Sequence, residues 1–545
     1  MTQADKLNTS TVILSSFLDA FKSSQGVLPP NGQPTSHQKA LFLCWCSAVF
    51  VWLMRTLTKH LVPSRFHLLD PGVPSSPTST STRTLLETVE DGGTMPNTTS
   101  APNVAQRRRE NVVGFDSFLH AVIILGLIMY YFYICDYVHL LPKASRTYSR
   151  DLFILFVILL FVVSGGLTGR ECNGKLLNRD QTEEWKGWMQ VMFVWYHYFK
   201  AAEIYNAIRL FIAAYVWMTG FGNFSFFWVR RDYSLHRVLK MLFRLNFLVV
   251  VVTVVTNNQY MLYYICAMHT FWFFSVYAMM RPYEHLNENR KVMFLKMSIY
   301  AGVVFIIYDL RAADIVFTPF KFILGYNGNL HEWNFRSGLD HYATFFGMIC
   351  AYNHPYFERL LKYVELDSFS SKQRLVKNSI RIGIGAALIF MIALWYTYVY
   401  TLGKYDYNKL HPYTSILPII TYIYFRNIFP RLRSKYAYML SWLGKITLET
   451  YIAQLHVYMQ GNAKQLIVYI QDYPLLNFLL ATIIYLVLSY VLFDVTGTFS
   501  AYLLPKDMFL LIKKVGFIAI WMAAAYVIVI VTSPQQVLEV FRIAN

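Results

Sequence analysis

The feature that most constrains this sequence is a series of apolar stretches of about 20 residues that recurs along nearly its whole length. Each stretch is long enough to cross a hydrocarbon core roughly 30 Å thick as a helix. Hydrophobic residues make up 55% of the 545 residues and charged residues 15%, whereas a soluble chain carries about a quarter charged residues. The sequence therefore predicts an all-α polytopic membrane bundle of about 11–13 transmembrane helices, without a separate soluble domain.

We expect a first span over residues 39–61 and about twelve more in one membrane-embedded domain, residues 115–532. These further spans are expected at residues 117–141, 151–168, 187–220, 238–256, 259–280, 292–308, 339–353, 380–402, 412–429, 436–460, 474–493 and 512–532. The stretch 187–220 is long enough for two elements, and the stretch 339–353 is short. Both therefore affect the predicted number of spans. A polar segment (1–38) without the features of a cleavable signal peptide precedes the spans, and a tail (533–545) follows them.

The connecting segments indicate an orientation in the membrane. Residues 62–114 are rich in Ser, Thr, Pro and Gly and predict a disordered lumenal loop. Basic residues concentrate in the loops 143–150, 230–237, 281–296, 359–381, 431–435 and 506–514. With the spans above, all six loops and residues 1–38 fall on one side, which the positive-inside rule makes cytosolic. The run Arg107–Arg109 is the exception, because it falls on the lumenal side.

Charge and cysteine usage exclude several other classes of function. The formal charge of +18 indicates membrane orientation or a basic mouth for a phosphorylated donor, and we expect no nucleic-acid partner. The six cysteines show no paired CxxC spacing, so we expect neither a disulfide framework nor a zinc or other metal site. The sequence has no GxSxG elbow, Walker loop or GxGxxG motif.

Ionisable side chains inside apolar spans are costly and therefore mark candidate functional sites. The first group, WYHYFKAAEIYNAIR (195–209), repeats polar residues at every third position: His197, Lys200, Glu203, Asn206 and Arg209. This spacing winds by about 60° per step, so the helix should be buried among others. One interpretation is a structural ion-pair network of Glu203 with Lys200 or Arg209. The other makes His197 or Glu203 a proton acceptor that the cations orient.

A second group lies in LGKITLETYIAQLHVYMQ (443–460). Lys445, Glu449, His456 and Gln460 fall within a narrow arc, because seven residues are nearly two helical turns. The expected orientation puts His456 near the lumen and Glu449 deeper in the membrane. This polar seam is either an acceptor-side catalytic surface or the surroundings of a hydrogen-bonded core histidine.

Two further groups involve single histidines and an ion pair. His269 lies in the middle of a span, where it is either a helix–helix hydrogen bonder or a neutral general base. Arg336 and Asp340 have the i, i+4 spacing of a salt bridge at a span start, and His411 begins another span from the lumenal side.

The depths of these groups suggest a division of chemical tasks. The histidines fall at mid-membrane or lumenal depths, whereas a set of cations falls toward the cytosol: Arg209, Lys240, Arg244 and Arg281. Acyl transfer from a thioester needs a base for the accepting hydroxyl and donors for the oxyanion. A nucleotide-linked donor also needs cations for its phosphates. The distribution therefore suits a cytosolic donor and a lumenal acceptor.

Five blocks of the sequence closely resemble one family: residues 184–227, 244–270, 335–348, 411–427 and 443–459. It is the multi-span O-acetyltransferase family of the plant reduced wall acetylation proteins, the fungal capsule O-acetyltransferase and the membrane part of sialate O-acetyltransferase. The resemblance covers roughly residues 115–530. It implies a multi-pass Golgi membrane enzyme that uses acetyl-CoA to O-acetylate polysaccharide or glycan. We expect no counterpart in this sequence to the lumenal hydrolase-like domain that precedes the membrane part of sialate O-acetyltransferase.

The family's polar blocks carry over to His197, Glu203, Asn206, Arg209, Arg244, Asn246, His269, Arg336, Asp340, His411, Glu449 and His456. We expect His197 or His269 to act as base or acetyl carrier, Glu203 to orient it, and His456 to serve the acceptor side. Arg209, Lys240, Arg244 and Arg281 would bind the donor, with Asn206, Asn246, Arg336, Asp340, His411 and Glu449 in support. The alternatives are a transporter that passes acetyl-CoA or acetyl groups to a separate lumenal acetyltransferase, and a scaffold in which the polar groups are structural.

Overall fold

The computed structural model describes residues 33–61, 113–321, 330–366, 370–460 and 464–532. Regular structure in these residues is almost all helical, which confirms the predicted all-α membrane fold. In this part of the chain, nine segments are long and apolar enough to cross a membrane. They are Ser36–Lys59, Phe115–Val138, Arg150–Leu167, Ala202–Arg230, Leu235–Thr256, Arg290–Tyr308, Ser371–Tyr400, Pro474–Leu503 and Met508–Thr532.

The helices of the described residues, in chain order, fall into longer and shorter ones. The longer helices are α2 (Ser36–Leu61), α4 (Phe115–Phe132), α5 (Arg150–Leu167), α6 (Arg179–Phe199), α7 (Tyr205–Arg230), α8 (Leu235–Thr256), α9 (Tyr264–Met280), α10 (Arg290–Tyr308), α14 (Ala343–Glu365), α15 (Ser371–Trp395), α21 (Pro474–Leu503) and α22 (Met508–Thr532). The shorter ones are α11 (Ala313–Phe317), α13 (Leu330–Gly338), α16 (Lys404–Thr414), α17 (Ile416–Asn427), α18 (Pro430–Arg433), α19 (Tyr438–Lys445) and α20 (Thr447–Val457).

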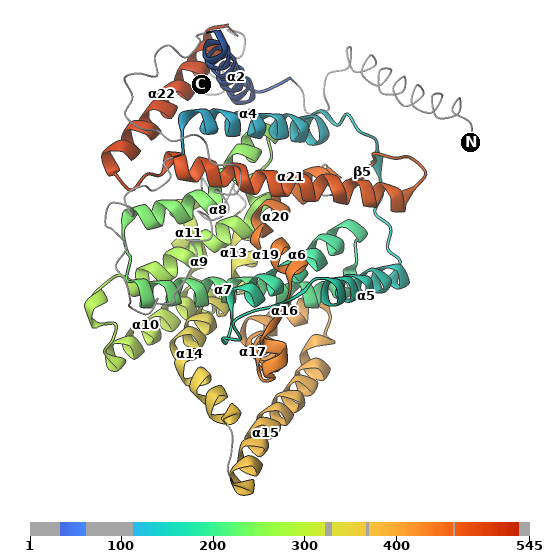
Figure 1. Ribbon diagram of the computed structural model, residues 1–545, viewed down its shortest axis with the longest axis vertical. Helices are drawn as coiled ribbons and strands as arrows, with labels where there is room; N and C mark the ends of the chain where they lie inside the picture. Colours follow the sequence, from blue (N-terminus) through green and yellow to red (C-terminus); the bar gives the residue numbers. More distant parts are fainter. Residues whose placement is uncertain (1–32, 62–112, 322–329, 367–369, 461–463, 533–545) are drawn as a thin grey trace.

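The helices stack in layers along the longest axis of the molecule (Figure 1). Helices α2 and α22 pack together at one end, and α4 and α21 follow. The centre holds α6, α7, α9, α19 and α20, and α15 and α17 lie toward the other end. The polar sequence groups therefore fall mostly on central helices, which are surrounded by apolar ones.

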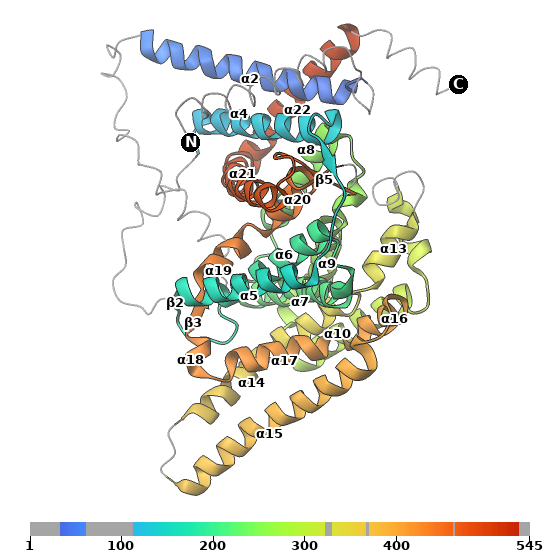
Figure 2. The ribbon, with the colours of Figure 1, turned by 90° about the vertical axis from the view of Figure 1, so that its right-hand side faces the viewer.

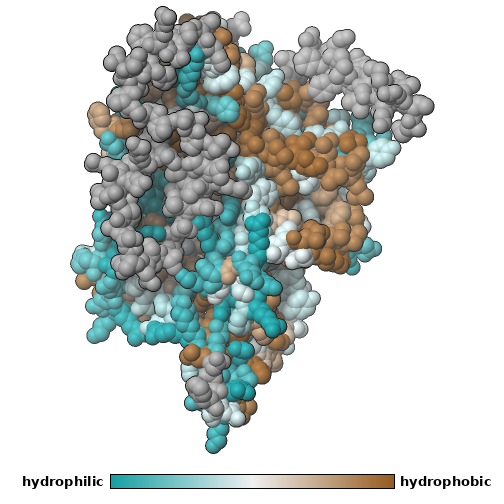
Figure 3. Space-filling view, viewed as in Figure 1, coloured by the Kyte–Doolittle hydropathy of each residue, from teal (hydrophilic) through white to brown (hydrophobic). Residues whose placement is uncertain are grey.

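Apolar side chains cover much of the outer surface. Figure 3 shows hydrophobic residues gathered over α21 and α5. The exposed set includes Leu155, Ile158 and Val162 on α5 and Leu479, Ile483 and Val487 on α21. An apolar exterior of this extent is stable in lipid but not in water, so these helices form the surface that contacts the bilayer.

Three predicted spans that carry polar groups are interrupted instead of continuous. The stretch 187–220 is divided between α6 and α7 by residues 200–204, where Lys200 has a left-handed backbone with φ of 55°. The stretch 412–429 breaks at Ser415, and the stretch 436–460 breaks at Ile446. Broken helices inside membranes present polar backbone and side chains to an interior site, and they are tolerated there because protein surrounds them.

Two small antiparallel sheets show which loops share a face of the molecule. Strand β1 (Lys143–Ala144) pairs with β5 (Gln465–Ile467), which also pairs with β4 (Met459–Gln460). Strand β2 (Gly169–Glu171) pairs with β3 (Lys435–Ala437). Figure 2 shows β2, β3 and α18 at one edge and α13 and α16 at the opposite edge. We call the edge of β2, β3 and Arg433 the basic face, and the edge of β1, β4 and β5 the distal face.

These pairings correct the predicted alternation of loops. Residues 143–150 lie on the distal face beside β5, and not with the other basic loops as predicted. The reason is the break at residues 200–204, since α6 and α7 cross the bundle twice where one crossing was expected. The additional crossing moves every connection that precedes it to the other face.

The orientation of α2 and α4 is also opposite to the predicted one. The start of α4 lies on the basic face, because Phe118 stacks on Tyr502 with ring centroids 4.3 Å apart and Lys514 binds the Tyr502 carbonyl at 2.8 Å. The end of α2 is beside it, since Arg55 binds Asp116 at 2.7 Å. Both helices that flank residues 62–114 thus reach the basic face. Residues 62–112, with the run Arg107–Arg109 and the predicted disorder, lie outside the described residues, as do 1–32 and the tail 533–545.

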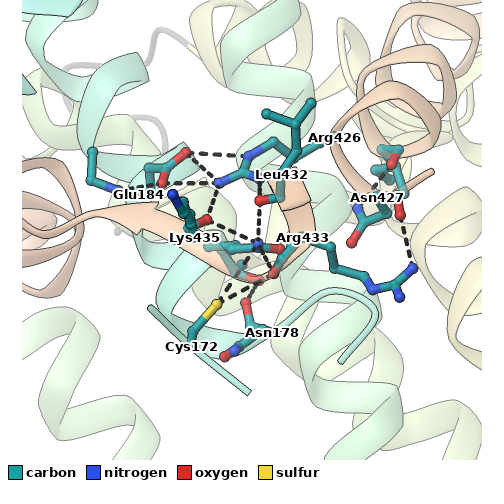
Figure 4. A network of polar contacts seen from close by, with 12 residues as sticks. Cys172, Asn178, Glu184, Arg426, Asn427, Leu432, Arg433 and Lys435 are labelled. Atoms are coloured by element: carbon teal, nitrogen blue, oxygen red, sulfur yellow. Dashed lines mark hydrogen bonds and ion pairs between the residues drawn. The ribbon is translucent and has the colours of Figure 1, made fainter. Parts of the chain in front are cut away.

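A network of polar contacts fixes α6 to the basic face (Figure 4). Arg426 at the end of α17 binds Glu184 at 3.1 Å, and Arg433 binds Glu365 at 2.7 Å. Gln181 donates to the carbonyl of Arg433 at 2.5 Å. The start of α6 is therefore held firmly, which positions its far end, with the polar residues, at the distal face.

The central helices approach one another through glycines. A Cβ added to Gly187 on α6, or to Gly444 on α19, would lie 1.9 Å from a backbone oxygen of the other helix. Helices α7 and α14 meet similarly through Gly220 and Gly347, where that distance would be 2.2 Å. Small residues that let backbones approach are the usual means of packing helices in membranes.

We predict that Gly444→Ala strongly destabilises the protein, because neither backbone can give way without separating α6 from α19. Overpacking of this kind costs about 1–3 kcal/mol or more. Thermal unfolding of detergent-purified protein measures the effect. Gly516→Ala on α22 is the control, since an added Cβ there meets no atom within 4 Å. Equal melting of the two variants would contradict the prediction.

Candidate active site

One buried histidine with a hydrogen-bond partner at each ring nitrogen is His456 on α20. Its Nδ1 lies 3.1 Å from Asp136 Oδ2, and its Nε2 lies 2.6 Å from the hydroxyl of Tyr263. His456 and Tyr263 are fully buried, and Asp136 is 7% exposed. Asn258 donates to the same Asp136 oxygen at 2.8 Å. We call Asp136, His456 and Tyr263 the first triad.

Irregular backbone brings the first triad together. Asp136 belongs to a π-helical turn, Tyr133–Val138, which extends α4 and ends at a left-handed His139. Tyr263 belongs to a 3₁₀ turn, Tyr260–Tyr263, that precedes α9. Irregular turns of these kinds occur often at functional sites, because they redirect side chains that a straight α-helix would turn elsewhere.

The bonds of the first triad set the chemistry available to His456. The carboxylate of Asp136 can only accept, so Nδ1 carries the proton and the lone pair is on Nε2. Nε2 then accepts a hydrogen bond from Tyr263. This is the arrangement of a general base that a carboxylate orients and whose imidazolium form it stabilises.

Gln460 extends this site toward the distal face. It is fully buried, and its Oε1 lies 3.1 Å from Nδ1 of His139. Its Nε2 has no hydrogen-bond partner among the described residues. An unpaired buried N–H is costly and is therefore a candidate donor to a ligand.

A second triad lies around His411 on α16. Its Nε2 is 3.1 Å from Asp340 Oδ1, and its Nδ1 is 3.0 Å from the hydroxyl of Tyr407. The other Asp340 oxygen is 3.4 Å from Arg209. Asp340 is thus shared between His411 and the Arg209 cation.

Glu449, one of the predicted supporting residues, is paired with a predicted donor-binding residue. Its fully buried carboxylate receives both terminal nitrogens of Arg244, with Nη2 at 3.1 Å from Oε2. Thr496 donates to it at 3.2 Å. Glu449 lies seven residues before His456, about 10 Å along α20. Arg244 therefore forms an ion pair in which the carboxylate is fully buried and the guanidinium is partly exposed.

The predicted catalytic residues do not form a single hydrogen-bonded cluster. His269 binds the hydroxyl of Thr219 on α7 at 2.6 Å. The ring of His197 packs on Phe193 with centroids 4.8 Å apart. The Glu203 carboxylate binds Arg150 at 2.6 Å and is 47% exposed. Glu203 thus does not orient a histidine as predicted, because the break at residues 200–204 turns it toward the distal face.

Arg336 and Arg209 also differ from their predicted pairing or position. Arg336 binds Glu332 at 3.0 Å and not Asp340, because α13 ends at Gly338 before an i, i+4 pair can form. Arg209 lies near the distal start of α7, whereas the uninterrupted span would have put it toward the cytosol.

The remaining predicted residues are spread over both halves of the bundle. Asn206 donates to the carbonyls of Tyr400 and Leu402. Asn246 donates to Thr270 at 3.0 Å. Lys240 lies near the start of α8, and the exposed Arg281 binds Glu284 at the basic face. The predicted donor-binding cations therefore do not converge. No three His, Cys, Asp or Glu side chains of the described part could hold a metal ion.

The fold and the two triads define a polytopic membrane protein with acid–base groups in its core. The family described as the 10 TM acyl transferase domain found in Cas1p matches residues 79–516. This match covers most of the chain, so the chain belongs to that family of membrane acyltransferases, and the predicted resemblance is confirmed.

One curated relative is the N-acetylneuraminate (7)9-O-acetyltransferase of Danio rerio. It is 33% identical over 408 residues, which are 72% of this chain and 51% of the relative. The chain thus spans about half the length of this relative. No solved structure matches the chain.

Proposed function

We propose that this protein is an O-acetyltransferase that moves the acetyl group of acetyl-CoA onto a hydroxyl of a polysaccharide or glycan. The observation that carries this proposal is His456, whose ring is bound by a carboxylate on one nitrogen and by a hydroxyl on the other. The acyltransferase family and the name of the relative support the reaction class.

In the proposed reaction His456 Nε2 takes the proton of the acceptor hydroxyl, either directly or through Tyr263. The alkoxide attacks the thioester carbonyl, and the unpaired Gln460 N–H is the donor available to the resulting oxyanion. The attack forms the new C–O bond, and collapse of the tetrahedral intermediate re-forms the carbonyl and breaks the C–S bond. The proton held by His456 then passes to the CoA thiolate, so His456 returns to its neutral form.

The faces of the molecule support a direction for the transfer. Lysine and arginine loops favour the cytosol, so the basic face is the cytosolic entrance for acetyl-CoA, toward which Lys240 and Arg281 lie. His456 lies on the side of Gln460 and the β4–β5 hairpin, so the acceptor meets it from the distal, lumenal face. A Golgi membrane is the proposed location, because glycan acceptors are lumenal there.

We predict that detergent-purified protein transfers label from acetyl-CoA, labelled in its acetyl group, to an added glycan. The measurement is the labelled ester on the glycan after separation from the donor. The control is donor labelled in the adenine, which should leave the glycan unlabelled. If the acetyl-labelled donor binds and remains intact with every glycan offered, the protein is a carrier and the proposal is wrong.

A further inference from the structure

A small cavity on the distal face is lined by cations that orientation in the membrane does not explain. Its volume is about 320 Å³. Its ionisable lining residues are Lys143, Arg146, Lys200 and Lys464, and Ala144, Ser145 and Gln465 complete the wall. The other basic loops lie on the opposite face, so the positive-inside rule would leave this face poor in cations.

Three separate segments bring these cations together. Lys143 lies in β1, and Lys464 lies next to β5, which pairs with β1. Lys200 joins them from the end of α6, where its left-handed backbone, with φ of 55°, is disfavoured for a side chain of this kind. The sheet and the helix end therefore set the backbone positions of these three lysines.

No lining residue carries a negative charge. Within the described part of the chain, Lys143, Lys200 and Lys464 form no ion pair, and the nearby Glu203 is bound by Arg150. Like charges held together repel each other, and a bound anion removes that repulsion. The cluster has the charge and the donors of an oxyanion site.

The cavity adjoins the candidate active site. Arg146 donates to the carbonyl of His197 at 3.2 Å. Gln465 is opposite Gln460 in the β4–β5 hairpin, and Gln460 contacts His139 in the loop after Asp136. A group bound among the cations therefore lies on the acceptor side of His456.

We propose that this cavity binds an oxyanion, either the carboxylate of an acidic sugar in the acceptor glycan or a phosphate group. The assignment to the acceptor rests on the proposed function, but the oxyanion site itself does not. Its lysines would hold the charged group and so place a neighbouring hydroxyl toward His456.

Calorimetry at low salt tests the site. It measures the binding of three probes to the full chain in phosphatidylcholine nanodiscs. The probes are an oligosaccharide with a terminal uronic acid, its neutral methyl ester, and inorganic phosphate. We expect the acid to bind at least about tenfold more tightly than the ester. If only phosphate binds, the oxyanion site stands and the acceptor assignment is wrong. Absence of binding by both anions overturns the site.

Variants locate the binding and separate it from catalysis. Lys143→Gln combined with Lys464→Gln should remove the preference for the acid, and Lys200→Gln alone should weaken it. Lys372→Gln is the matched control, because Lys372 is exposed on α15, away from the cavity. His456→Gln should keep the anion binding, so failure of the catalytic proposal and failure of this one are distinguishable. Unchanged binding in the lysine variants overturns the site.

Discussion

Replacing His456 with glutamine is expected to lower acetyl transfer by about 10²–10⁴-fold while the protein stays folded. Glutamine can still bond to Asp136 and Tyr263, but it cannot take up a proton at the position of Nε2. The measurement is the rate of labelled ester formation at saturating acetyl-CoA, with the elution profile and melting temperature recorded for the same sample.

The control for this experiment is His354→Gln. His354 is partly buried on α14, where its Nε2 lies 3.3 Å from the carbonyl oxygen of Leu176. His411→Gln is the informative comparison, because it changes the second triad in the same way. A folded His456→Gln protein with unchanged activity, or a loss that appears only in His411→Gln, would contradict the assignment of the base.

The second large effect is expected from the Arg244–Glu449 ion pair. Arg244→Met removes the cation beside the fully buried carboxylate of Glu449. That carboxylate then keeps only the hydrogen bond from Thr496. An uncompensated buried charge of this kind costs about 3–5 kcal/mol. Arg244→Met combined with Glu449→Met should recover most of that loss, because both charges are then removed. Thermal unfolding in detergent measures all three proteins.

The control here is Arg281→Met, because Arg281 and Glu284 are both largely exposed. Its effect on stability should stay within about 1 kcal/mol. A double variant as unstable as Arg244→Met alone would contradict the ion-pair explanation. A stable Arg244→Met protein that no longer binds acetyl-CoA would restore the predicted donor-binding role of Arg244.

The sequence predicted the class of fold because the bilayer imposes length and composition on every span. It allowed two elements in the stretch 187–220 but did not place the break at residues 200–204. The segment contains no proline or glycine, and its alanines and charged residues favour a continuous helix. Lys200 nevertheless ends α6 with a left-handed backbone, with its N–H bonded to the Tyr196 carbonyl.

Part of the candidate site could also be predicted from the constraints that the bilayer imposes. The cost of charge in a membrane correctly marked His456, His411, Asp340 and Glu449 as members of buried polar groups. Asp136, a carboxylate within the apolar YYFYICDYV segment, carries the same signal and was missed.

The pairing of these residues could not be predicted. Asp136 and His456 are 320 residues apart in the sequence, and Tyr263 stands among many tyrosines with no distinguishing pattern. The i, i+4 rule paired Arg336 with Asp340, but it holds only within a continuous helix, and α13 ends between them.

The most direct measurement is an experimental structure of the full chain with a non-reactive analogue of acetyl-CoA. We expect the nucleotide at the basic face and the acetyl carbonyl carbon close to the first triad, with room for an acceptor oxygen about 3–3.5 Å from that carbon and beside His456 Nε2. An acetyl group placed instead against His197, His269 or His411 would contradict the proposed base.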